Sequence, residues 1–513
     1  MSTVTGAGST VASLFRSAVR CYPDRVAIEH DGRQLSYAEL LFRVERIASL
    51  LIALDTRGTR RYAVLSENRA EYLEVQLAAA WLGGAVSCLN WRLSPAELLD
   101  CIELVEPAVL VCSERHSAKL SGLHLPPLSL IALGPEWERR IDSASRFRPD
   151  DTVSPEAPWL VLYTGGSTGR PKGAILSQRA EIARMSSWCL DFGLRPGDTD
   201  VAWPPLFHMG GAEPALLSLL TGGRVIVEDG FDADRLAVHI EREPQLHWIS
   251  IQPGSTGRLI EALERRGTRP AALRTCGVMP DLVPRTEVAR LTSLLGAAYC
   301  NSFGSTETGT PPLSGGWIEP GRDDYDLAKL PSALVEIRLL DESGCDADEG
   351  EVGEITVKGP TLFSGYWQDA AATDAAFSDG WYRMGDLARR RADGRFEFVD
   401  RAKYLIKSGG ENIYPAEIEQ ALLASGEVSD VVVVRRTDPR WGEVPVALVV
   451  AKRADVDAGR LAAWCRTRIA SFKQPKEIIF VPAERLARNS LGKVSRKELE
   501  NWVERTTRER SIE

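Results

Sequence analysis

The chain has 513 residues, of which 44% are apolar and 26% charged, and its formal net charge is −9. This length exceeds a usual single domain, so two or more folded units are expected, and the acidic balance argues against a nucleic-acid-binding surface. No stretch of about 18 uncharged apolar residues predicts a membrane span. The first residues lack the blocks of a signal peptide, and nine scattered cysteines without a C-x-x-C pair fit reduced thiols. We therefore expect a cytoplasmic protein.

The N-terminal third predicts an α/β fold. Apolar residues between Val11 and Val19 indicate an amphipathic helix, and residues 26–40 read as strand, Asp-Gly turn, strand and a helix capped by Ser36 with Glu39. From Tyr62 onward, short strand-like runs alternate with amphipathic helices. Such alternation predicts parallel βαβ units in layers.

Residues 163–173, YTGGSTGRPKG, predict a phosphate-binding loop. They follow the apolar run 159–163, which reads as a buried strand, and the glycines allow several backbone N–H groups to converge on an anion. Pro171 stands where a Walker A loop needs glycine, so that class of nucleotide site is excluded. The residues expected to contact phosphate are Thr164, Gly165, Gly166, Ser167, Thr168, Gly169 and Lys172.

A second motif, NSFGSTET at residues 301–308, places a hydroxyl beside a carboxylate. Thr306 and Glu307 are hard oxygen ligands of the kind that Mg²⁺ prefers, and Phe303 offers a flat apolar face.

Both motifs resemble those of the acyl-adenylate-forming (ANL) superfamily, which includes acyl- and aryl-CoA synthetases, peptide-synthetase adenylation domains and luciferases. The resemblance implies a large N-terminal domain of αβαβα layers plus a β-rich subdomain, over residues 1–400. It further implies a hinge at 401–403 and a small mobile α+β domain over residues 404–513. It assigns ATP or AMP binding to the phosphate loop and to Asn301, Ser302, Phe303, Gly304, Ser305 and Thr306.

The resemblance also assigns catalytic roles. Lys172 and the loop hold the departing pyrophosphate, Glu307 binds Mg²⁺ with Thr168, and Thr306 lies beside them. Lys493, in NSLGKVSR, corresponds to the lysine that positions the carboxylate during adenylation. Ala487 and Ser490 replace two prolines that are frequent in that loop.

The acyl pocket is assigned through the segment WPPLFHMGG, residues 203–211. A neutral imidazole at His208 cannot pair with an α-ammonium group, so His208 favours an acid without one. The residues expected to line the pocket are His208, Met209, Gly211, Met279, Pro280 and Gly304. Residues 279–282 replace a Gly-Gly-Ala-Pro segment that is usual in the family, so the pocket is expected to be reshaped, and a glycine usual near residue 328 is also missing.

Further matches concern the ribose and CoA. The resemblance gives Asp386, Arg401 and Phe398 to the nucleotide and Lys403 to the hinge. A carboxylate accepts paired hydroxyl hydrogen bonds from a ribose, and an arginine can reach the same sugar. The residues assigned to CoA are Ser408, Gly409, Gly410, Glu411, Trp441 and Lys473.

The function implied is that of an AMP-forming acid–CoA ligase that binds ATP, Mg²⁺, CoA and a carboxylic acid. The acid and ATP give an acyl-adenylate and pyrophosphate, then the C-terminal domain rotates and the CoA thiol attacks. Three alternatives remain: an enzyme that stops at the adenylate or passes the acyl group to a carrier protein in trans, a luciferase-type enzyme, and a catalytically silent binding protein. A homodimer also remains open.

Overall fold

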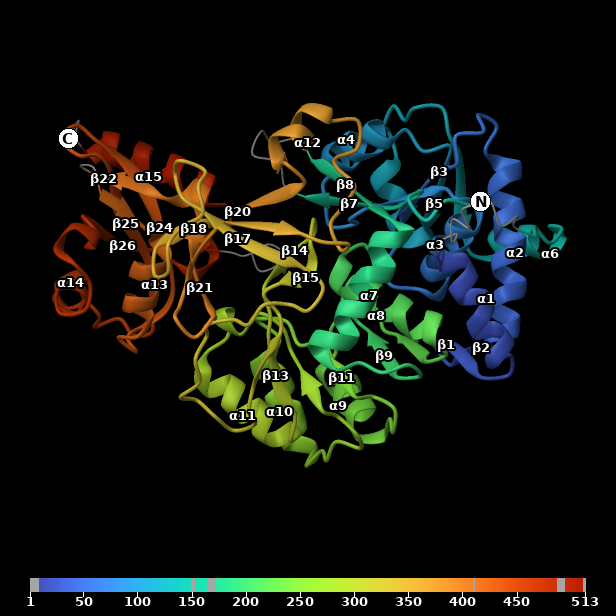
Figure 1. Ribbon diagram of the computed structural model, residues 1–513, viewed down its shortest axis with the longest axis horizontal. Coiled ribbons are helices and arrows are strands. Elements are labelled where there is room, and N and C mark those ends of the chain that lie inside the picture. The colour runs from blue at the N-terminus through green and yellow to red at the C-terminus, as the bar shows by residue number, and fades with distance from the viewer. Residues whose placement is uncertain (1–8, 149–152, 165–170, 409–410, 487–493, 511–513) are drawn as a thin grey trace, which may run out of the picture. The chain divides into compact units, whose positions relative to one another are not determined.

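The computed structural model describes residues 9–148, 153–164, 171–408, 411–486 and 494–510 (Figure 1). The chain forms two compact units, the first from residues 1–337 and 357–382 and the second from residues 338–356 and 383–513. Residues 338–356 and 383–400 thus pack with the C-terminal residues, although the sequence suggested a boundary at residue 400. The hinge at 401–403 stays a prediction.

A six-stranded sheet of order β6-β5-β3-β4-β7-β8 carries the phosphate-loop segment in the first unit. Its pairs are parallel except for the antiparallel β7–β8 hairpin. The strands are β3 (Arg61–Leu65), β4 (Ala85–Cys88), β5 (Val109–Ser113), β6 (Ser129–Leu133), β7 (Pro158–Thr164) and β8 (Lys172–Ser177). All residues of β4 and β5 are buried, as expected for parallel strands covered on both faces.

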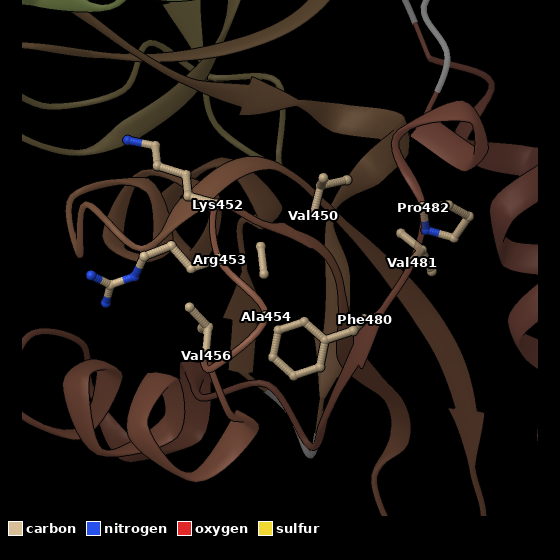
Figure 2. A pocket seen from close by; sticks show the side chains of 9 residues that line it. Val450, Lys452, Arg453, Ala454, Val456, Phe480, Val481 and Pro482 are labelled. Atoms are coloured by element: carbon tan, nitrogen blue, oxygen red, sulfur yellow. The ribbon is translucent and has the colours of Figure 1, made fainter.

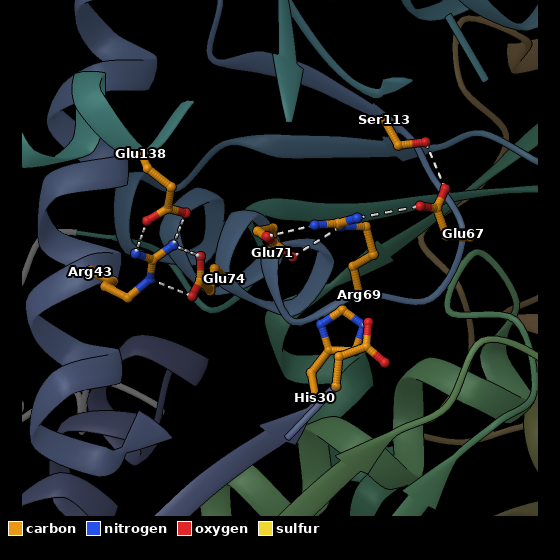
Figure 3. Close-up of polar contacts among 9 residues, drawn as sticks. His30, Arg43, Glu67, Arg69, Glu71, Glu74, Ser113 and Glu138 are labelled. Carbon is orange, nitrogen blue, oxygen red and sulfur yellow. Dashed lines mark hydrogen bonds and ion pairs between the residues drawn. The ribbon is translucent and has the colours of Figure 1, made fainter. Parts of the chain in front are cut away.

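Helices pack against this sheet and against one another: α2 (Tyr37–Leu54), α3 (Ala70–Leu82), α4 (Pro95–Val105), α5 (Glu114–Ser117), the 3₁₀ turn η1 (Ala118–Leu120) and α6 (Pro135–Ser143). Every residue of α3 is buried, including charged ones. Arg43 on α2 forms paired hydrogen bonds with both Glu74 on α3 and Glu138 on α6 (Figure 3). One guanidinium thus bridges two carboxylates and joins three helices.

A second sheet has the order β2-β1-β10-β9, with β1 (Val26–His30), β2 (Arg33–Ser36), β9 (Thr199–Ala202) and β10 (Arg224–Val227). Helix α8 (Met209–Thr221) contacts β9 and β10 of this sheet and packs against α1 (Val11–Cys21) and α7 (Gln178–Phe192). The predicted helix at the N-terminus is confirmed, and so is the cap on α2, where Ser36 and Glu39 form a reciprocal capping box.

A third sheet, β11-β12-β13-β16, has its own apolar core. Its strands are β11 (Trp248–Ile249), β12 (Thr275–Cys276), β13 (Ala298–Asn301) and β16 (Gly316–Ile318), and a short ribbon of β14 (Gly304–Ser305) and β15 (Gly309–Pro312) follows β13. Figure 1 shows the surrounding helices α9 (Ala233–Arg242), α10 (Thr256–Arg266) and α11 (Arg285–Leu295), while the 3₁₀ turn η2 (Pro280–Leu282) precedes α11. The sheet thereby brings residues 279–282 and 301–307 into one region.

A β-rich sheet of order β17-β18-β20-β19, with β21 beside β20, contains the points where the chain passes from one unit to the other. Its elements are β17 (Glu336–Leu340), β18 (Val352–Lys358), α12 (Ala370–Ala376), β19 (Phe377–Ser378), β20 (Trp381–Arg390) and β21 (Phe396–Arg401).

The rest of the second unit is the α+β fold that the sequence predicts. A sheet of order β23-β22-β25-β24, with β26 beside β25, packs with three helices (Figure 1). Its elements are η3 (Ala402–Tyr404), β22 (Ile406–Ser408), β23 (Glu411–Ile413), α13 (Pro415–Leu423), β24 (Val428–Asp438), β25 (Gly442–Ala451), α14 (Ala458–Arg466), η4 (Ser471–Lys473), β26 (Glu477–Phe480), η5 (Ala483–Leu486) and α15 (Arg496–Arg510).

Two general properties bear on the sequence predictions. All nine cysteines are free thiols, and Cys21 and Cys345 are exposed rather than in the core. Among the described residues, no helix combines the length and the apolar character needed to cross a membrane.

Candidate active site

The β7–β8 hairpin carries the ends of the predicted phosphate loop. Thr164 pairs with Lys172 across the two strands, and both residues are half-buried. The predicted residues Gly165, Gly166, Ser167, Thr168 and Gly169 lie outside the described part of the chain. The close register therefore holds the hydroxyl of Thr164 and the ammonium group of Lys172 at the two ends of the same loop.

A segment far along the chain extends this hairpin. Ser364 N donates to Ile175 O at 2.8 Å, Ile175 N donates to Gly365 O at 2.9 Å, and Trp367 N donates to Gly173 O at 2.7 Å. Tyr366 thereby forms an antiparallel bridge with Ala174. This pairing brings the Tyr366 ring beside the phosphate-loop lysine, whose Nζ lies 4.9 Å from the ring centroid.

Tyr366 also joins the lysine to the predicted metal ligand. Its hydroxyl donates to Glu307 Oε1 at 3.0 Å, and Phe363 N donates to Glu307 O at 2.9 Å. Burial, followed by the charge of Glu307, raises the pKa of the Tyr366 hydroxyl well above its usual range, so it remains a donor. Lys172, Tyr366 and Glu307 form one constellation of a cation, a hydroxyl donor and a carboxylate.

The turn that carries Glu307 is shaped by a close backbone approach. A Cβ atom at Gly304 would collide with the carbonyl oxygens of residues 309–311, so only glycine fits there. Ser305 N donates to Thr308 Oγ1 at 3.0 Å, which closes the turn, and Thr306 within it is half-buried. Phe303, also half-buried, donates its N–H to Ser314 Oγ at 3.1 Å.

A fully buried arginine stabilises this turn through hydrogen bonds. Arg184 on α7 donates from Nη2 to Thr306 O at 3.0 Å, from Nε to Thr361 O at 2.8 Å, and from Nη1 to Glu213 Oε1 at 3.2 Å. Glu181 is completely buried nearby, and burial together with the charge of Glu213 raises its pKa to about 8. At neutral pH the two carboxyl groups and the arginine therefore carry little net charge.

The predicted acyl-pocket residues of α8 have largely structural contacts. His208 caps the helix by accepting a hydrogen bond at Nδ1 from Gly210 N at 3.2 Å, so its Nε2 carries the proton in the neutral ring. Gly211 packs on the carbonyl oxygens of Pro204 and Pro205, where a larger residue would collide. Met209, the first residue of α8, is half-buried.

The reshaped segment lies against the NSFGSTET strand. Met279 has left-handed backbone geometry with φ +52°, and its N–H donates to Ser302 Oγ at 3.1 Å. Met279 is 37% exposed, whereas Pro280 is buried. Asn301, at the end of β13, is buried as well.

In the second unit, the predicted ribose residues face each other. Asp386 on β20 pairs with Arg401 on β21, and Arg401 Nε lies 3.0 Å from Asp386 Oδ1. Asp386 is 2% exposed, so its carboxylate depends on this partner. Phe398 lies on the same strand as Arg401, where it pairs with Ala388 and is half-buried.

The described residues assigned to CoA also come together. Ser408 pairs with Gly442, the residue after Trp441, and η4, which ends at Lys473, contacts β23. The Lys473 ammonium group is already matched by Glu417 Oε2 at 2.6 Å, which weakens its assignment as a phosphate ligand. Lys403 is exposed on η3, and its carbonyl oxygen accepts from Arg435 Nη2 at 3.1 Å. Gly409, Gly410, the Glu411 side chain and Lys493 lie outside the described residues.

A cavity of about 570 Å³ in the second unit is lined by the end of β25 and by β26, with Phe480, Lys452 and Arg453 among its residues (Figure 2). Its lining contains none of the predicted site residues. Within the described ranges, no three His, Cys, Asp or Glu side chains are grouped to hold a metal ion.

Three structurally important residues escaped the sequence predictions. Tyr366, Arg184 and Lys329 each act through contacts with segments far away in the chain. In the sequence, Gly365 before Tyr366 is the one signal of an unusual backbone position, and no short motif marks Arg184 or Lys329.

This chain belongs to the AMP-binding enzyme family. The sequence model for the AMP-binding enzyme matches residues 15–367, and that for the AMP-binding enzyme C-terminal domain matches residues 417–493. The predicted membership of the acyl-adenylate-forming superfamily and the predicted fold class are thereby confirmed.

Known proteins resemble the chain over nearly its full length. The indoleacetate–CoA ligase of Aromatoleum aromaticum is 34% identical over 502 residues, which cover 94% of this chain and 96% of that protein. A feruloyl-CoA synthase from an Amycolatopsis species is 34% identical over 486 residues, with coverages of 94% and 96%. The o-succinylbenzoate CoA synthetase of Bacillus subtilis, solved with its acyl-adenylate intermediate, has a TM-score of 0.81 at 27% identity, covering 95% of this chain and 97% of that one.

Proposed function

We propose that this chain is an AMP-forming acid–CoA ligase that activates an aryl carboxylic acid. The observation that carries the proposal is the constellation of Lys172, Tyr366 and Glu307 at the end of the β7–β8 hairpin. It supplies a cation and an oriented carboxylate beside the phosphate loop, in a chain that resembles named CoA ligases over 94% of its length.

In the first half-reaction, the carboxylate of the acid attacks the α-phosphorus of ATP and pyrophosphate leaves. Lys172 stabilises the charge that gathers on the departing pyrophosphate, and Tyr366 keeps it and Glu307 in place. Because these groups are already oriented, little reorganisation is needed when the charge develops. Lys493 is proposed to bring the carboxylate and the α-phosphate together.

Glu307 fits a magnesium ion. Mg²⁺ is usually bound by one or two carboxylates together with substrate phosphates, and the single buried carboxylate of Glu307, oriented through Oε1, suits that pattern. When bound, Mg²⁺ would neutralise phosphate charge. Thr168 is the further ligand proposed from the sequence.

Residues of the second unit complete the proposal. Asp386 and Arg401 have the carboxylate and guanidinium chemistry needed to bind ribose hydroxyl groups. The hairpin of β22 and β23, next to Trp441, is the proposed place for the CoA thiol to approach. The second half-reaction then gives acyl-CoA and AMP.

The acid class follows from two arguments. The three compared proteins are named for indoleacetate, ferulate and o-succinylbenzoate, all of which carry an aromatic ring. His208 offers no negative charge to an α-ammonium group, which disfavours amino acids. Transfer of the acyl group to a carrier protein in trans is the alternative second step, and a cytoplasmic location is expected from the free cysteines.

The test is to incubate the protein with ATP, Mg²⁺ and a panel of aryl, alkyl and amino acids, with and without CoA. We expect pyrophosphate release with aryl acids and acyl-CoA only when CoA is present. Pyrophosphate release without any acyl-CoA would favour the carrier-protein alternative, and no release with any acid would refute the proposal.

A matched pair of lysine variants links the activity to the site. Lys172→Met should lower the rate about 100- to 1000-fold, the usual effect of losing one preorganised charge-stabilising group. Lys358→Met is the control, because its ammonium group also lies over an aromatic ring, 5.9 Å from that of Trp381, in the same compact unit. Its rate should stay within about twofold of the unmodified protein.

A further inference from the structure

The two segments that depart from the family pattern meet in an ion pair between a buried lysine and an exposed aspartate. Lys329 Nζ lies 2.6 Å from Asp281 Oδ2 and 2.5 Å from Asn301 Oδ1. Asp281 belongs to the 279–282 segment, and Lys329 follows the position where the usual glycine is missing. The two departures from the family pattern are therefore in direct contact, although Asp281 and Lys329 are 48 residues apart in the chain.

The lysine is held almost without freedom. Its side chain is 1% exposed, and its third contact is to Leu327 O at 3.5 Å. A buried ammonium group is tolerated only when charge and hydrogen-bonding partners satisfy it, so Lys329 requires Asp281 and Asn301 where they stand. Asn301 in turn donates from Nδ2 to Ala328 O at 3.2 Å, which closes the cluster.

The cluster fixes the short turn η2 at two neighbouring points. Asp281 ties the middle of the turn to Lys329, while the Met279 N–H binds Ser302 Oγ at the residue after Asn301. Met279 is thus held in a left-handed conformation that is unfavourable for a residue other than glycine. Without the anchor, the turn could relax and its exposed side chain would move.

We propose that the Asp281–Lys329 ion pair is a positioning device that fixes Met279 as a wall of the acyl pocket and so selects among aryl acids. This inference rests on the proposed function, because it assigns η2 to the acid site of that reaction. Neither Asp281 nor Lys329 needs to touch the acid. Their contribution passes through the position of Met279, which is 37% exposed.

The test compares Asp281→Asn, Lys329→Met and the double variant Asp281→Leu/Lys329→Met with the unmodified protein. Pyrophosphate release is measured with indole-3-acetate, ferulate, 2-succinylbenzoate and octanoate, and the ratio of kcat/KM between the best acid and the others defines selectivity. We expect each single variant to lower that ratio about tenfold, within the range for a displaced pocket wall, while the KM for ATP changes less than about twofold.

The double variant separates a loss of selectivity from a loss of stability. Removing both charges avoids leaving the buried Lys329 ammonium group without its partner, so the thermal midpoint of the double variant should equal or exceed that of Asp281→Asn, while its selectivity stays low. Arg290→Met is the control, since Arg290 on the neighbouring α11 forms an exposed ion pair with Glu264. That variant should keep the original selectivity.

A second readout separates this inference from the proposed function. Non-reactive acyl-sulfamoyl adenosine analogues of the same four acids are titrated calorimetrically into each variant. If the unmodified protein turns over none of the acids, the proposed function fails, yet the binding ratios still report on the ion pair. Ratios in Asp281→Asn and Lys329→Met equal to those of the unmodified protein would overturn the positioning role, as would an equal rise in KM for ATP and for every acid.

Discussion

Replacing Tyr366 with phenylalanine removes one hydroxyl group from the candidate site. The ring that lies beside Lys172 and packs against Phe363 at 4.9 Å would remain, while the donor to Glu307 Oε1 would be lost together with the hydroxyl's contact with Tyr382. A hydrogen bond to a charged group contributes about 1.5–3 kcal/mol. If Glu307 must be oriented to reach the transition state, the expected loss in kcat/KM is roughly 10- to 150-fold.

The assay is pyrophosphate release at increasing Mg²⁺ concentration, with ATP and the acid held at saturation. Because the tyrosine orients the proposed metal ligand, Tyr366→Phe should raise the Mg²⁺ concentration for half-maximal rate as well as lower the maximal rate. Tyr22→Phe serves as the control, since Tyr22 is exposed and its ring lies over Arg25 in the same unit. A Glu307→Gln variant completes a double-mutant cycle.

The cycle decides whether the two residues act together. When one residue acts through the other, the double variant should lose little more than Glu307→Gln alone. Fully additive losses, or an unchanged Mg²⁺ dependence in Tyr366→Phe, would refute the view that the hydroxyl acts through the carboxylate.

Three further predictions concern other parts of the molecule. Met279→Gly should change the free energy of unfolding by less than about 1 kcal/mol, because relief of left-handed strain offsets the added freedom of the unfolded chain. In the same variant, kcat/KM for the bulkiest acid should rise about tenfold relative to that for the smallest. An unchanged ratio of these two kcat/KM values would place Met279 away from the acid. Because the pKa of Glu181 is raised from 4.5 to about 8, the folded protein holds a proton there that the unfolded chain has lost, so the contribution of Glu181 to stability is fully present below pH 4.5 and is lost as pH rises toward 8. Urea unfolding across that range should show a shallower fall for Glu181→Gln, and an identical fall would contradict the assignment. Asp386→Ala should raise the KM for ATP roughly 10- to 100-fold in steady-state assays, whereas a lower kcat at unchanged KM would argue against a ribose-binding role.

The local parts of the structure were accessible from sequence because their causes are local. The capping box of Ser36 and Glu39 and the alternation of strands with helices depend on residues only a few positions apart, and all are confirmed. The pairing of Asp386 with Arg401 follows from a hairpin between adjacent strands, so its short spacing was informative as well.

Other expectations needed the folded chain. The boundary at residue 400 differs from the compact units, because residues 338–356 and 383–400 belong to strands that pack with the C-terminal residues. Lys473 was assigned to CoA, yet its ammonium group lies 2.6 Å from Glu417 on α13. A neighbour of that kind comes from packing between elements, which the linear order does not reveal.

The sequence by itself determined the family, the layered α/β fold and the chemistry of the reacting groups, because motifs such as YTGGSTGRPKG and NSFGSTET carry their functional residue types at fixed local spacing. Only the tertiary structure decided what orients those groups. Tyr366 reaches Glu307 because residues 364–367 pair with β8, and Lys329 reaches Asp281 because β13 brings their two segments together. A buried charge or hydroxyl is stable only where its partner stands, and that partner can come from any point along the chain.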